Sequence, residues 1–213
     1  IRDNIYIVVI ALVILLALLY MGVVGYRRVY KKVEHSLYFE EQKSIKTFFK
    51  LYFVQLCHPV VCYDRIKANR SRIPLWVCLL APAAVPLVCI FRIAAGNFAI
   101  VGKTLSDTSL VYEAAIILVP LALWIFISYL VTSLMSGEAT LKETIAAGCY
   151  SLVPWVVFTP IVTLASHIAG SSDQVFFTIA EGILLALVII ELLVAMGTMN
   201  DYSFTKTLLV TLI

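Results

Sequence analysis

Four ionisable side chains lie in stretches that are otherwise apolar. Glu181 and Glu191 lie deep inside residues 175–198, and Arg92 and Glu113 lie near the ends of two other apolar stretches. A charge at the centre of a bilayer costs about 2.5–3.5 kcal/mol, so these side chains are expected to face other helices or a cavity. Such acids either carry protons or polar solutes, or they hydrogen-bond to neighbouring helices or to a partner chain. The sequence supports both interpretations equally.

The positions of these residues predict how they pair. Arg92 is expected to form an ion pair with Glu181 or Glu113, because all three fall toward the same side of the membrane. Glu191 has no charged partner in any other predicted span. It is therefore expected to be protonated or hydrogen-bonded, since burial disfavours the charged form of a carboxyl group.

Two further groups of residues carry weaker signals. His167, with Ser171 and Asp173 nearby, is typical of a hydrolase only if the fold orients the three side chains, and a short loop does not do so. Cys57-His58-x3-Cys62 offers three metal ligands, two of them adjacent, which is a poor zinc site. We therefore expect no enzyme activity, no metal and no cofactor.

The composition predicts the elements that hold these residues. The 213 residues are 62% hydrophobic and 14% charged, with a mean hydropathy of +0.99. A soluble domain is closer to half apolar and a quarter charged, so the chain is predicted to be an all-α, multi-pass membrane protein. The predicted spans are residues 5–24, 73–95, 114–135, 144–167 and 175–198, followed by another that begins near Phe204.

The distribution of basic residues predicts the orientation. Residues 5–24 contain no charge and are followed by Arg27 and Arg28, which predicts an N-terminus outside the cell. Of the 16 Lys and Arg residues, 11 fall within residues 25–72. We therefore expect a bacterial cell (plasma) membrane protein whose basic segment, residues 27–72, faces the cytoplasm and the anionic inner leaflet. The net charge of +3 gives no reason to expect nucleic acid as a partner.

An amphipathic helix is predicted within this basic segment, just before His58-Pro59. Three basic side chains fall on one face and aromatic side chains on the other, which is typical of a helix lying in the membrane plane. Pro59 then ends or bends the helix. The segment is either such an interfacial elbow, which the periodicity favours, or a solvated loop. The predicted interfacial residues are Lys43, Lys46, Lys50, Phe48, Phe49 and Tyr52.

Prolines recur inside the predicted spans. Each proline leaves the carbonyl four residues earlier without its helical hydrogen bond, as Pro154 does for Tyr150. Such breaks line substrate sites in transporters, and they are also common as packing kinks, which the sequence favours here. Thr140 and Glu143 have the spacing of a capping box ahead of the next span. The predicted helix breaks are Pro59, Pro82, Pro86, Pro120, Pro154 and Pro160, with Tyr150 at the carbonyl that Pro154 frees.

The order of these motifs resembles the Yip1 domain, in particular its bacterial members. A His-Pro elbow and a basic stretch precede the spans, and residues 136–140 read Ser-Gly-Glu-Ala-Thr. The next span contains Gly148-x-Tyr150-x-Leu152-x-Pro154. The resemblance covers about residues 45–213 and implies a five-helix bundle. It divides the chain into a tethering helix (1–26), the basic segment with the interfacial helix (27–72) and the Yip1-like bundle (73–213).

The resemblance also implies a function. Bacterial members look like non-enzymatic membrane proteins, and some are similar to accessory components encoded beside sugar-type ABC importers, which predicts a scaffold subunit bound to a multi-span permease. The alternatives are a small-solute or proton-coupled transporter that uses Glu181 and Glu191, and a membrane-trafficking factor like the eukaryotic members. The first helix departs from those eukaryotic members, which begin with a long cytoplasmic arm.

Overall fold

The computed structural model describes residues 45–97, 101–102, 108–135, 137–168, 174–203 and 205–207. By its contacts the chain divides into two compact units, Ile1–Thr47 and Phe48–Ile213. Regular structure in the described residues is helical, as the sequence predicts. The predicted first helix, Lys43 and nearly all of the span beginning at Phe204 lie outside the described residues. The second unit starts at Phe48 and so includes residues 48–72 together with the bundle.

Within the described residues, four segments are long and apolar enough to cross a membrane. They agree with the predicted spans to within four residues at each end. Two of them are interrupted, and each interruption divides a span into two helices. The spans are Leu75–Ala95 (α4, Leu75–Cys78, and α5, Leu80–Ala95), Leu110–Leu134 (α7), Leu141–Ala165 (α8, Leu141–Ser151, and α9, Val153–Ala165) and Gln174–Asn200 (α10).

The interruption between α4 and α5 lies at Leu79, three residues before Pro82. Pro82 has no N–H, so it leaves the Cys78 carbonyl without its helical partner. The Tyr52 hydroxyl donates to the Val77 carbonyl at 2.6 Å and lies 3.2 Å from the Cys78 carbonyl. A neighbouring helix thus supplies the donor that a carbonyl freed inside a membrane requires.

The second interruption, at Leu152, precedes Pro154 and is limited to one residue between α8 and α9. The Ser151 hydroxyl donates to the Gly148 carbonyl at 2.7 Å beside this break. At three further prolines the helices continue without ending, and each proline removes one hydrogen bond from its helix. They are Pro86 in α5, Pro120 in α7 and Pro160 in α9.

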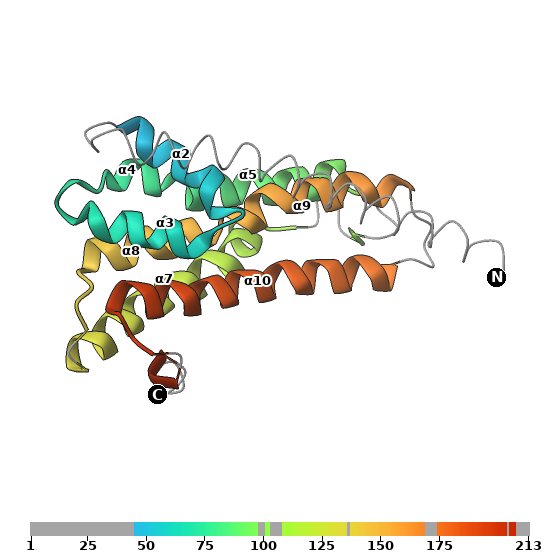
Figure 1. The fold of residues 1–213 in the computed structure, drawn as a ribbon. Helices are drawn as coiled ribbons and strands as arrows, with labels where there is room; N and C mark the ends of the chain where they lie inside the picture. The colour runs from blue at the N-terminus through green and yellow to red at the C-terminus, as the bar shows by residue number, and fades with distance from the viewer. Residues whose placement is uncertain are drawn as a thin grey trace. The chain divides into compact units, whose positions relative to one another are not determined.

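Residues before the first described span form a helical hairpin. α2 (Ile45–Gln55) and α3 (Pro59–Ala68) are joined by a short turn, with Pro59 at the first position of α3, where a missing N–H costs nothing. α3 packs against both α8 and α10 (Figure 1). The predicted break at Pro59 is therefore present. α3 is thus built into the bundle and is not a solvated loop, whereas the interfacial position of α2 stays a prediction.

The buried face of α2 differs from the predicted aromatic face. Phe48, Leu51, Val54 and Gln55 are buried, whereas Phe49 is 46% exposed. These buried positions follow the helical spacing of three or four residues, so they form the face of α2 that the bundle covers. Helical spacing places Phe48 and Phe49 on one face, and of the two only Phe48 is covered by protein.

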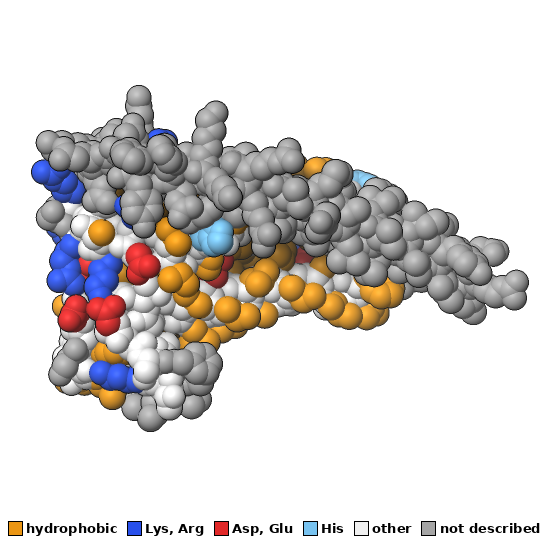
Figure 2. All heavy atoms as spheres, in the orientation of Figure 1, with side chains coloured by type: hydrophobic (Ala, Val, Ile, Leu, Met, Phe, Trp, Pro, Cys, Tyr) orange, Lys and Arg blue, Asp and Glu red, His pale blue; other side chains and the backbone are white. Residues whose placement is uncertain are grey.

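Charged side chains gather at the end of the second unit where α3 and α10 finish (Figure 2). The Lys67 ammonium pairs with Asp201, and it lies 3.7 Å from the Glu138 carboxylate. At the same end, Arg70 Nε lies 2.9 Å from Glu143 Oε1. These contacts connect the end of the hairpin to the polar turn between α7 and α8 and to the end of α10.

The capping box predicted at the start of α8 is confirmed. The Thr140 backbone N–H donates to Glu143 Oε2 at 2.6 Å, and the Thr140 hydroxyl donates to the same oxygen at 2.7 Å. The Glu143 side chain is fully buried and also accepts from Arg70. The Glu143 carboxylate therefore both caps the start of α8 and binds Arg70 at the end of the hairpin.

Close packing of α8 on α7 requires glycine at position 148. A Cβ built there would lie 2.7 Å from Ile125 Cγ1 and 2.8 Å from its Cδ1, whereas a Cβ at Gly182 on α10 would meet nothing within 4 Å. We expect Gly148→Leu to lower the free energy of unfolding by about 1–3 kcal/mol through overpacking. The matched change Gly182→Leu is expected to be neutral or mildly stabilising, because leucine favours helix. Thermal unfolding in detergent measures both, and equal melting temperatures for the two variants would contradict the close approach.

Candidate functional site

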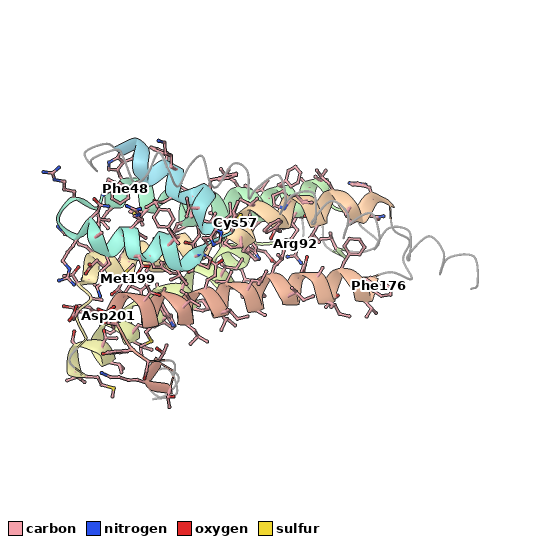
Figure 3. All side chains as sticks on the ribbon, in the orientation of Figure 1. Phe48, Cys57, Arg92, Phe176, Met199 and Asp201 are labelled. Carbon is pink, nitrogen blue, oxygen red and sulfur yellow. The ribbon has the colours of Figure 1, made fainter. Side chains whose placement is uncertain are left out.

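Three helices bring Arg92, Glu113 and Glu181 together, and we call these residues the arginine triad. Arg92 Nε lies 2.8 Å from Glu181 Oε1, and Arg92 Nη2 lies 2.7 Å from Glu181 Oε2, so the guanidinium holds this carboxylate with two hydrogen bonds. Arg92 Nη1 lies 3.9 Å from Glu113 Oε2. The predicted pairing of Arg92 with these acids is confirmed, and it connects α5, α7 and α10. Figure 3 marks the position of Arg92 within the bundle.

The ends of two helices favour these charges. Arg92 lies in the last turn of α5, where a positive charge interacts favourably with the helix dipole, and Glu113 lies in the first turn of α7, where a negative charge does. Ser109 caps α7 by accepting from the Tyr112 N–H at 3.4 Å. The triad thus forms where α5 ends and α7 begins, with Glu181 in the first third of α10.

A cavity of about 430 Å³ lies beside the triad, between α5, α7, α9 and α10. Its lining is apolar except for the triad, Thr159 and the indole N–H groups of two tryptophans. A second hollow of about 180 Å³, largely polar, shares Arg92 and Glu181 with it. The ion pair therefore separates a polar hollow from an apolar cavity. The apolar cavity is lined by Cys89, Ile116, Ile117, Pro120, Leu121, Trp124, Leu152, Trp155, Leu185, Val188, Ile189 and Leu192 together with Thr159 and the triad.

Glu191 belongs to a different polar group, which we call the hairpin anchor. Gln55 Nε2 on α2 donates to Glu191 Oε2 at 2.6 Å and to the Tyr63 hydroxyl on α3 at 2.7 Å. Burial raises the pKa of the Tyr63 phenol well above its usual value, and the neighbouring Glu191 adds to this rise, so the phenol stays protonated. Glu191 precedes Asp201 by ten residues, or about 15 Å of helix. The hairpin therefore reaches from the charged end to the middle of α10.

Gln55 is the main site residue that the sequence interpretation missed. It is fully buried, and its Oε1 has no hydrogen-bond partner among the described residues. The expectation of a hydrogen-bonded Glu191 was right, but the partner comes from the hairpin and not from another span. The signal was present in the sequence, since Gln55 falls on the same helical face as Phe48 and Leu51 and is the one amide on it.

The remaining predicted residues lie elsewhere. Tyr150 is buried in α8, where its hydroxyl donates to the Phe48 carbonyl at 2.7 Å and its ring lies 4.7 Å from that of Tyr52. Tyr150 and Tyr52 therefore fasten α2 to the bundle. Lys50 is partly exposed on α2. The Lys46 side chain lies outside what the structure describes, so the basic face of the interfacial helix remains a prediction.

Helical spans, a packed hairpin and ion pairs within the apolar region define the class of protein, which is a multi-pass α-helical membrane protein. Residues 54–213 match the Yip1 domain, so the chain belongs to the Yip1 family. The match begins within α2, so it includes the α2–α3 turn and α3. No curated protein and no solved structure was found to match the chain.

Proposed function

We propose that this protein is a non-enzymatic accessory subunit, a membrane scaffold that binds a multi-span permease. The observation that supports this proposal is that each acid in the described spans bonds to a side chain of another element. Glu113 and Glu181 lie against Arg92, Glu191 accepts from Gln55, and Glu143 pairs with Arg70. Each acid thus connects its own helix to another element, which suits a fixed framework.

An exposed aromatic patch offers a contact surface for such a partner. Phe49 and Trp76 meet edge to face with ring centroids 6.1 Å apart, and Trp76 is 58% exposed. Phe53 and Leu80, each one helical turn further along, are also exposed and continue the patch. Aromatic side chains are enriched at the centres of protein interfaces and dominate their binding energy.

The expected partner is the permease of an ABC importer in a bacterial plasma membrane, with the charged end of the bundle in the cytoplasm. The bacterial Yip1 resemblance and the concentration of basic residues before the second span support this assignment. In such a complex the scaffold would hold the permease and would not hydrolyse ATP itself.

Copurification from the native source in mild detergent, with mass spectrometry, tests this function. We expect a multi-span permease to copurify, and we expect deletion to impair uptake while ATP hydrolysis continues. Trp76→Ala should reduce the recovered permease about tenfold, as loss of an interface hot spot does. Phe126→Ala on α7, also 58% exposed, is the matched control and should leave recovery unchanged. Isolation as a lone monomer, with normal uptake in the deletion strain, would contradict the proposal.

A transporter of small solutes or protons is the second candidate, and the cavity beside the arginine triad favours it. Reconstitution of the purified chain in vesicles separates the two functions, because a transporter gives flux without any partner. A role in membrane trafficking rests on the family match alone, and capture of a small GTPase instead of a permease in the same purification would support it.

A further inference from the structure

A buried hydroxyl without a partner lies in the wall of the cavity beside the arginine triad. Thr159 lines this cavity and is only 2% exposed, and its hydroxyl has no hydrogen-bond partner among the described residues. Thr163, one helical turn along α9, instead donates to the Thr159 carbonyl at 2.9 Å. Buried hydroxyls are nearly always satisfied, and an unsatisfied one is destabilising. An oxygen atom of a bound molecule would satisfy the Thr159 hydroxyl.

The rest of the cavity is long and largely apolar. Its walls run from Glu113 to Trp124 on α7 and from Glu181 to Leu192 on α10. Each of these intervals is eleven residues, or about 16 Å of helix. The volume of about 430 Å³ falls in the range of small-molecule sites. These dimensions fit one extended hydrocarbon chain.

One side of the cavity lies between α7 and α10. Ile116 on α7 and Ile189 on α10 line it, and they are 51% and 60% exposed. α7 packs on α5 and α8, whereas α10 packs on α9, α8 and α3. An apolar molecule dissolved in the bilayer therefore has a route into the cavity between these two helices.

The charged side chains at one end of the cavity are already engaged. Glu181 accepts two hydrogen bonds from Arg92. Glu113 lies 3.9 Å from the same guanidinium and makes a further interaction. A charged ligand would lose its water here without gaining an open partner of opposite charge, which is costly. The occupant is therefore expected to be uncharged.

The depth of Thr159 selects a free molecule over the chain of a bilayer lipid. Thr159 precedes Ala165, where the span Leu141–Ala165 ends, by six residues, or about 9 Å of helix. The ester groups of bilayer lipids lie in the interfacial region, outside the hydrocarbon core. A lipid whose ester stays in that region does not bring an oxygen atom to Thr159, whereas a single-chain molecule can enter the cavity entirely.

We propose that this cavity binds an uncharged single-chain molecule with one oxygen atom, such as a long-chain alcohol. The hydroxyl of the alcohol bonds to the Thr159 hydroxyl, and its chain extends along the apolar walls toward Trp124 and Leu192. The site goes beyond the proposed function, because it would exist in the scaffold whether or not a permease is bound.

Tryptophan fluorescence of the full chain in phosphatidylcholine vesicles tests this site. Of the three tryptophans, Trp124 and Trp155 line the cavity, and Trp76→Phe removes the third, which lies in the exposed aromatic patch. Bromododecanol, with its bromine at the end away from the hydroxyl, should quench this fluorescence saturably, because bromine quenches an indole that it contacts.

Competition at equal mole fraction in the bilayer then defines the ligand. Dodecanol should displace bromododecanol at least about fivefold more effectively than dodecane, in line with one net hydrogen bond. It should also displace it more effectively than dodecanoate, which has to bury a charge. Dodecane or dodecanoate that competes as well as dodecanol would overturn the proposal.

Variants in the Trp76→Phe background locate the binding within the chain. Thr159→Val should weaken bromododecanol binding about fivefold and leave bromododecane binding unchanged, because only the alcohol can bond to the lost hydroxyl. Thr132→Val, at an equally buried threonine outside the cavity, is the matched control and should change neither. Val188→Phe fills the cavity and should abolish both.

A melting temperature of Thr159→Val no lower than that of the parent chain shows that the fold is intact. If Thr159→Val weakens the alcohol and the alkane equally, or weakens neither, the hydroxyl does not recognise the ligand. Normal binding of both probes by Val188→Phe would exclude this cavity as the site.

Discussion

Arg92→Leu is expected to lower the free energy of unfolding by about 3–5 kcal/mol, because it leaves the Glu181 carboxylate without the guanidinium that pairs with it. Glu181 loses two hydrogen bonds of 2.8 and 2.7 Å, and the nearly buried Glu113 loses its contact with the guanidinium at 3.9 Å. The links from α5 to α7 and α10 are lost together. Thermal unfolding in mild detergent, followed by circular dichroism, measures this loss.

The control for this prediction is Arg72→Leu, which removes an exposed arginine at the charged end. It should change the free energy of unfolding by less than about 0.5 kcal/mol, as surface substitutions usually do. For the carboxylate partner, Glu181→Gln should lower the free energy of unfolding less than Glu181→Leu does, because the amide oxygen still accepts from Arg92. If Arg92→Leu and Arg72→Leu unfold at the same temperature, the triad does not hold the three helices together.

The sequence predicted the spans well because hydrophobic length is a local property. A run of about twenty apolar residues is typical of a membrane helix, so the positions of α7 and α10 follow from composition to within four residues. The pairing of Arg92 with acids was also predictable. Charges inside a membrane need partners of opposite charge, and the predicted spans contain few such side chains.

The hairpin was not predictable in the same way. Residues 45–57 have the periodicity of a surface helix, and the lysines on one face favour that interpretation. The contacts that fasten the hairpin to the bundle are long-range. Gln55 reaches Glu191, 136 residues away, and Tyr150 reaches the Phe48 carbonyl, 102 residues away. Periodicity shows that a face is apolar, but it does not show whether lipid or protein covers that face.

The cavity could not be predicted for a similar reason. Trp124 and Leu192 are ordinary apolar residues of two spans, and only the packing of α7, α9 and α10 leaves space between them. The orphaned Thr159 hydroxyl likewise looks unremarkable in sequence, since threonines in membrane helices usually bond to their own backbone. Thr163 and Thr132 do so, at 2.9 and 2.8 Å.

Gln55→Leu is expected to detach the hairpin from α10 and to lower the free energy of unfolding by about 3 kcal/mol. The change removes both hydrogen bonds of the amide, to Glu191 and to Tyr63, and leaves a carboxyl group buried against leucine. Cys62 on α3 reports the detachment directly. It is fully buried, and burial raises the pKa of its thiol well above the usual value, so a membrane-permeant maleimide should react with it slowly in the native protein.

In Gln55→Leu we expect Cys62 to react faster, because the loosened hairpin exposes it. Gln174→Leu, at an exposed glutamine at the start of α10, is the matched control and should leave both the reaction and the melting temperature unchanged. The double variant Gln55→Leu/Glu191→Leu should recover most of the lost stability. A buried polar pair replaced by apolar side chains is often neutral or stabilising, whereas half of a pair is costly. A double variant that is as unstable as the sum of its single changes would show that Gln55 and Glu191 act separately and do not hold the hairpin as a pair.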